Sequence, residues 1–93
     1  MDDAAIASEL ATLDAWARDG DEITKDFVCP SFPDAIAFVV RIGFLAERAN
    51  HHPDIDIRWR TLSVRLSTHD AGGLTSLDFA LAREIDETAP WRS

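Results

Sequence analysis

Hydrophobic positions in the first part of the chain are spaced three or four residues apart, which predicts a helix. Ile6, Leu10 and Leu13 follow this spacing, so we expect a short helix over about residues 3–14. Asp2 and Asp3 stand at its start, where the positive end of the helix dipole favours acidic side chains.

The spacing then falls to two, the interval of a β-strand. The segment EITKDFVC turns three apolar side chains to one side, with Lys25 as the exception on that side. A strand is therefore predicted here, and a weaker strand is expected before it, near Trp16. The three apolar residues are Ile23, Phe27 and Cys29.

The longest helical pattern covers residues 34–49. Ser31 and Asp34 have the spacing of a capping box, which marks a helix start. The apolar surface of this helix is wider than one sheet face requires, so we expect a sheet on one side and another helix, of this chain or of a second subunit, on the other. The three-to-four spacing is carried by Ala35, Phe38, Ile42, Leu45 and Ala49, and the apolar surface is widened by Ile36, Val39, Val40 and Phe44.

Two alternating runs after Pro53 predict a hairpin, because each places apolar residues at every second position. The runs lie close enough in the chain to pair antiparallel through a turn at about residues 59–61. The first run carries Ile55, Ile57 and Trp59; the second carries Leu62, Val64 and Leu66, with Ser63, Arg65, Ser67 and His69 on its other side.

A last helix is predicted after the glycine-containing loop DAGGL. Thr75 suits its N-cap, with Asp78 three residues on and Leu74 and Phe79 placed as a hydrophobic staple. Its core face is expected to carry Leu77, Leu81 and Ile85. The element order predicts an α+β fold in one domain over residues 1–93, with three helices on one face of a four-stranded antiparallel sheet.

The composition limits the partners that this domain suits. Seventeen acidic and nine basic residues give a net charge of -8, which repels phosphate backbones and anionic membranes, so neither nucleic acid nor membrane is an expected partner. Cys29 is the only cysteine, which rules out an internal disulfide and disfavours a thiolate metal cluster. The acidic N-terminus and the absence of a long apolar run favour the cytoplasm.

Three histidines between residues 51 and 69 allow three interpretations. His51 and His52 suit the end of a helix, where the dipole favours a cationic ring. The histidines and Asp78 could supply four zinc ligands, although adjacent residues of an extended chain point to opposite sides and rarely bind one ion. Imidazoles also transfer protons near neutral pH, which suits acid–base catalysis. Periodicity alone does not choose among these interpretations.

From Trp16 to about Ile85 the chain resembles the pterin-4a-carbinolamine dehydratases, a family also known as the dimerisation cofactor of a homeodomain transcription factor. The family pattern joins an acidic residue, a His-His-Pro triplet, an aromatic residue, a further histidine and an aspartate. In this chain the pattern is met by Glu47, His51, His52, Pro53, Trp59, His69 and Asp78.

This resemblance implies dehydration of a 4a-hydroxytetrahydropterin to quinonoid dihydropterin, as in tetrahydrobiopterin recycling, without metal or other cofactor. It assigns acid–base catalysis to His51, His52 and His69.

The resemblance further implies a homodimer or homotetramer. It adds Asp78, Glu47 and Trp59 as substrate-binding residues. Asp78 is equally well explained as a helix cap. Glu47 either orients an imidazole or is a solvated helix residue. Trp59 is better explained by core packing. A catalytically weak pterin-binding or protein-assembly module of the same fold is the alternative function.

Overall fold

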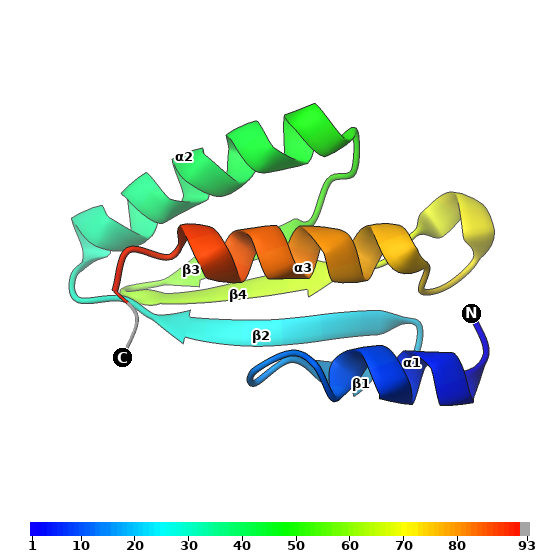
Figure 1. Cartoon of the computed structure of the whole chain (residues 1–93). Helices are drawn as coiled ribbons and strands as arrows, with labels where there is room; N and C mark the ends of the chain where they lie inside the picture. The colour runs from blue at the N-terminus through cyan, green and yellow to red at the C-terminus, as the bar shows by residue number, and fades with distance from the viewer. Residues whose placement is uncertain (92–93) are drawn as a thin grey trace.

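The computed structural model describes residues 1–91. Its four strands form one antiparallel sheet in the order β1-β2-β4-β3, and α2 and α3 lie over one face of this sheet (Figure 1). The predicted α+β fold and its element order are confirmed. The elements are α1 (Asp3–Leu10), β1 (Ala17–Asp19), β2 (Glu22–Val28), α2 (Phe32–Ala49), β3 (Asp54–Arg58), β4 (Thr61–Leu66), the 3-10 helix η1 (His69–Ala71) and α3 (Ser76–Thr88).

The core lies between the sheet and the helices, because the inward positions of the two central strands are apolar. Ile23 of β2 pairs with Leu66 of β4, and Phe27 pairs with Leu62, so the predicted alternation of both strands is confirmed. Helix α1 adds the buried Ile6 to the same cluster. The helices add further buried residues, namely Ala35, Phe38, Ile42, Phe79, Leu81, Ala82 and Ile85.

Helix α2 begins at Phe32, two residues before the predicted start, because Ser31 caps it. The Ser31 hydroxyl accepts a hydrogen bond from the Asp34 amide at 3.1 Å. The wide apolar surface expected from the sequence is present, since the side turned away from the core keeps large apolar residues. These residues, here called the α2 stripe, are Phe32, Ile36, Val40 and Phe44, with exposed fractions between 42% and 75%.

Helix α1 is shorter than predicted and ends at Leu10. The amides of Thr12 and Leu13 bond to carbonyls only three residues back, which tightens the chain out of the α-helix. Ala15 then adopts a left-handed backbone conformation with φ of 63°, and the chain reverses into β1. Leu13 still packs against the core, so its apolar character reflects burial in a turn.

The turn predicted at about residues 59–61 is confirmed, whereas His69, which the pattern placed on the second strand, lies outside it. Trp59 forms the two-residue turn between β3 and β4 with Arg60, and its φ of 54° is unusual for a bulky side chain. Trp59 is 71% exposed, so the expectation of core packing is wrong. His69 begins η1, because β4 ends at Leu66 and an isolated bridge between Thr68 and Gly73 closes a separate loop.

The inner face of α3 also differs from the prediction at its first turn, where Leu77 is 49% exposed. Each step of four residues rotates a side chain by about 40° around the axis, so Leu77 lies about 80° from Ile85 and leaves the buried face. Asp78 and Phe79 fill this position and are fully buried. Among the described residues, no helix combines the length and the apolar character needed to cross a membrane.

Candidate active site

The end of α2 places the two adjacent histidines in different environments. Asn50 takes the left-handed conformation that ends many helices, with φ of 50°, and its amide bonds back to the last turn. The His51 amide also donates to the Ala46 carbonyl at 3.0 Å. This reversal leaves the His51 side chain 10% exposed and the His52 side chain 60% exposed, so the pair does not form one two-histidine ligand set.

The buried His51 ring meets a buried carboxylate on α3. His51 Nε2 lies 2.6 Å from Asp78 Oδ1, and the Asp78 side chain is 0% exposed. The carboxylate reaches this position because Asp78 is the third residue of α3 and forms a capping box with Thr75. Asp78 therefore caps the helix, as the sequence predicted, and contacts a candidate catalytic histidine at the same time.

Two further donors complete the surroundings of Asp78. The Thr68 hydroxyl donates to Asp78 Oδ2 at 2.8 Å, and the Thr75 amide donates to the same oxygen at 2.9 Å. Within residues 1–91 every buried side-chain nitrogen and oxygen has a hydrogen-bond partner. The site is thus a fully bonded polar group inside an apolar core, an arrangement that fixes side-chain orientation.

The exposed His52 pairs with Glu47, one turn before the end of α2. Their Nε2 and Oε2 atoms lie 3.0 Å apart, and the Glu47 side chain is 80% exposed. An ion pair this open to solvent contributes little to stability. The geometry does allow the carboxylate to orient the imidazole, so Glu47 contacts a candidate catalytic residue rather than the core.

His69 follows directly after Thr68, whose hydroxyl binds Asp78. It is exposed, and the amide of Gly72 bonds to its carbonyl at 3.0 Å. The loop that carries His69 is therefore tied to the carboxylate that holds His51. Trp59 differs, because β3 separates it from His51 and His52 and β4 separates it from His69, and five strand residues span about 17 Å.

Thr68 is the contact that sequence reasoning missed. Its only signal in the sequence is its place in the segment STHD, directly before a candidate catalytic histidine. A threonine at the end of an alternating run does not reveal which side chain its hydroxyl will meet. The partner, Asp78, lies ten positions later in the chain and on another element.

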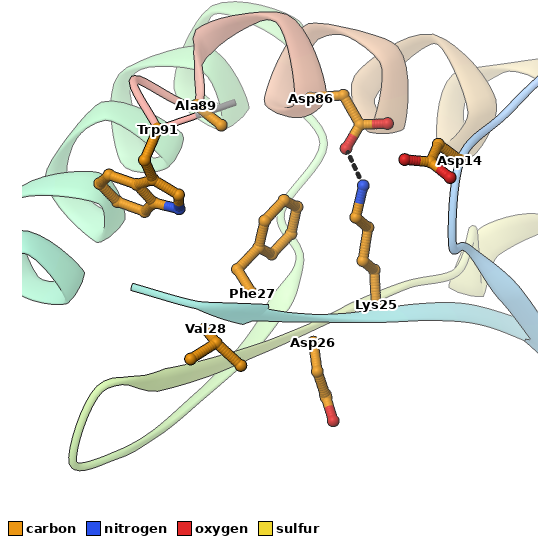
Figure 2. A pocket seen from close by; sticks show the side chains of 8 residues that line it. All are labelled: Asp14, Lys25, Asp26, Phe27, Val28, Asp86, Ala89 and Trp91. Atoms are coloured by element: carbon orange, nitrogen blue, oxygen red, sulfur yellow. Dashed lines mark hydrogen bonds and ion pairs between the residues drawn. The ribbon is translucent and has the colours of Figure 1, made fainter. Parts of the chain in front are cut away.

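A separate hollow of about 300 Å³ lies beside β2 and the end of α3, and none of the three histidines lines it (Figure 2). Lys25 Nζ reaches across it to Asp86 Oδ1 at 2.8 Å, and the Trp16 indole donates to Asp86 Oδ2 at 3.0 Å. Lys25, the polar exception on the inner side of β2, is thus neutralised by a carboxylate on α3. This pair explains how the strand tolerates a charge there.

The described residues contain no group of three or more histidine, cysteine, aspartate or glutamate side chains arranged to hold a metal ion.

Comparison with known proteins gives consistent results. A family model described as pterin 4 alpha carbinolamine dehydratase matches residues 1–88. A protein of Roseiflexus castenholzii, provisionally named pterin-4-alpha-carbinolamine dehydratase, is 62% identical over 87 residues, which are 94% of each chain.

Two solved structures share the fold. A Brucella melitensis protein described as a transcriptional coactivator/pterin dehydratase superposes with a TM-score of 0.92 at 28% identity, over 96% of this chain and 97% of that one. A pterin dehydratase-like protein identified as a RuBisCO assembly factor in the alpha-carboxysome gives a TM-score of 0.70 at 22% identity, over 85% of this chain and 94% of that one.

Proposed function

Because the chain belongs to the pterin-4a-carbinolamine dehydratase family, a family of hydro-lyases, we propose that it dehydrates a 4a-hydroxytetrahydropterin to quinonoid dihydropterin and water. The observation that carries this proposal is the buried contact between His51 and Asp78 at 2.6 Å. It holds an imidazole in one orientation directly before the exposed His52, as an acid–base site requires.

The reaction moves two protons and changes no oxidation state. One group gives a proton to the 4a-hydroxyl oxygen, the carbon–oxygen bond breaks, and water leaves. A second group takes the proton from the adjacent ring nitrogen. Histidines suit both steps near neutral pH, so we assign this work to His51, His52 and His69, with no metal or redox cofactor.

Glu47 supports the reaction through His52, whose ring it contacts at 3.0 Å. Asp78 supports it through His51. In both cases a carboxylate fixes the orientation of an imidazole, so these two acidic residues need not touch the pterin to affect its conversion.

We also propose that the protein is a homodimer or homotetramer. The α2 stripe places four large apolar side chains on one exposed helix face, and a second copy of the chain would bury them. β3 is an edge strand, so its backbone offers a second contact. Two β3 strands paired antiparallel, with Arg58 facing Asp56 of the partner subunit, would bring Trp59 of the partner subunit opposite Ile55.

This pairing would be the route by which Trp59 reaches substrate, since β3 and β4 separate it from the histidines of its own chain. A Trp59→Ala variant should then show a raised KM with little change in kcat, measured by steady-state dehydration. An unchanged KM would mean that Trp59 takes no part in substrate binding.

The second candidate function is a protein-assembly module that keeps the fold with weak catalysis. The α2 stripe favours it, and a protein of the same fold is described as a RuBisCO assembly factor. Timed dehydration of freshly made carbinolamine, with and without protein, separates the two candidates. An unaccelerated reaction would favour assembly over catalysis.

We further propose that the enzyme recycles tetrahydrobiopterin in the cytoplasm, a reducing compartment that suits a protein with a single cysteine.

A further inference from the structure

The hydrogen bonds around Asp78 can be assigned directions by counting protons. An ionised carboxylate only accepts, and each threonine hydroxyl has a single proton to donate. Asp78 accepts at Oδ2 from the Thr68 hydroxyl and from the Thr75 amide, at 2.8 and 2.9 Å. The Thr68 hydroxyl therefore donates its one proton to Asp78 and has none left for a second acceptor.

The directions of the remaining hydrogen bonds follow from this donation. Thr68 Oγ1 and Thr75 Oγ1 lie 2.7 Å apart, and the Leu77 amide donates to Thr75 Oγ1 at 3.3 Å. Because Thr68 has no second proton, the Thr75 hydroxyl must be the donor between the two threonines. The donors thus run in one direction, from Leu77 through Thr75 and Thr68 to the carboxylate.

The same count of protons indicates which nitrogen of the His51 ring carries a proton. An ionised Asp78 has no proton to give at Oδ1, so in that state His51 Nε2, 2.6 Å away, is the donor between the two side chains. In a neutral imidazole the other nitrogen then has an unshared electron pair. In this arrangement His51 is the Nε2–H tautomer, and Nδ1 is the ring nitrogen able to take a proton from substrate.

We propose that Thr68 is a positioning residue of the dehydration reaction, which holds Asp78 so that His51 presents Nδ1 to the pterin. This inference rests on the proposed function. The backbone of Thr68 is anchored separately, because its amide donates to the Gly73 carbonyl at 3.1 Å and its carbonyl accepts from the Gly73 amide at 3.3 Å. Removing the hydroxyl therefore leaves the loop before His69 tied in place.

The test compares Thr68→Val, Thr68→Ser and the neighbouring Ser67→Ala in the full-length protein. Ser67 is the matched control, because its hydroxyl donates to the Asp21 carbonyl at 2.8 Å, away from the site. Nitrogen-15 NMR of the imidazoles reports the His51 tautomer, and steady-state dehydration gives kcat and KM.

We expect the wild-type protein to show the Nε2–H tautomer at His51. Thr68→Val should lose this single tautomer and lower kcat about 10-fold with KM nearly unchanged, because orientation of the base is lost while the pterin still binds. Thr68→Ser should restore both readouts, and Ser67→Ala should change neither.

Two results would overturn the role of Thr68: an Nδ1–H tautomer in the wild-type protein, or a Thr68→Val variant with wild-type tautomer and kcat. The second result, in an active enzyme, leaves the proposed function intact. A wild-type protein that does not accelerate dehydration contradicts the proposed function itself. The role of Thr68 in that reaction is then contradicted as well.

Discussion

His51 and Asp78 stand 27 positions apart in the chain, yet their side chains meet at 2.6 Å inside the fold. One residue follows the end of α2, and the other lies in the first turn of α3. The contact joins two helix ends on the same face of the sheet, and it converts a helix-capping carboxylate into a partner for an imidazole. The candidate site therefore depends on the packing of α2 and α3 as much as on the histidines themselves.

Replacing Asp78 with asparagine should affect both stability and catalysis. We expect a loss of about 1–3 kcal/mol in the free energy of unfolding, because buried donors lose a charged acceptor. The dehydration rate should fall by roughly 10²-fold, since His51 loses its fixed orientation. Urea unfolding followed by circular dichroism and a dehydration assay measure the two effects.

Asp2→Ala is the matched control for Asp78→Asn. Asp2 also caps a helix, accepting from the Ala5 amide at 2.8 Å, but it is exposed. Its loss should cost about 1 kcal/mol or less and leave the rate unchanged. If Asp78→Asn behaves in the same way as Asp2→Ala, then Asp78 acts only as a cap.

The sequence predicted the fold well where one face of an element is buried. The alternation in β2 and β4 and the Thr75 cap of α3 were readable because local spacing decides them. The turn at about residues 59–61 was also readable, but the expected core packing of Trp59 was wrong, because periodicity does not show which way a turn residue points. The contact of Thr68 with Asp78 was not readable, because local spacing does not specify which side chains of separate elements meet.

The α2 stripe makes a prediction about assembly. Val40 and Phe44 are 55% and 75% exposed, so a charge at either position should leave the fold intact while opposing helix contact between subunits. We expect the wild-type protein to sediment as a dimer or tetramer at micromolar concentration, and Val40→Glu with Phe44→Glu to reduce its size.

Val28→Glu provides the control for the stripe, because Val28 is 61% exposed but lies at the end of β2. This variant should keep the wild-type size. A wild-type monomer near 10.3 kDa would refute self-association. A dimer that withstands both charges on α2 would instead indicate pairing through strand edges.

Cys29 gives a prediction about alkaline pH. Burial raises the pKa of the Cys29 thiol, and the negative charge of Asp34 raises it further. A thiol whose pKa is higher in the folded state stabilises the fold fully below the unfolded value of about 8.5, and this contribution is lost as pH rises through the folded pKa. Above about pH 8.5 the wild-type protein should therefore lose stability more steeply than Cys29→Ala. Parallel urea-unfolding profiles between pH 7 and 10 would show that the thiol makes no such contribution.

Stopped-flow measurement of freshly made 4a-carbinolamine tests whether the histidines of this fold catalyse dehydration. With chelator present, wild-type protein should accelerate the reaction above its uncatalysed rate. The alanine variants of His51, His52 and His69 should each lower the catalysed rate by roughly 10²-fold or less, because each group supplies only part of the proton transfer. A wild-type rate equal to the uncatalysed one, or three variants as fast as the wild type, would show that these histidines do not catalyse dehydration.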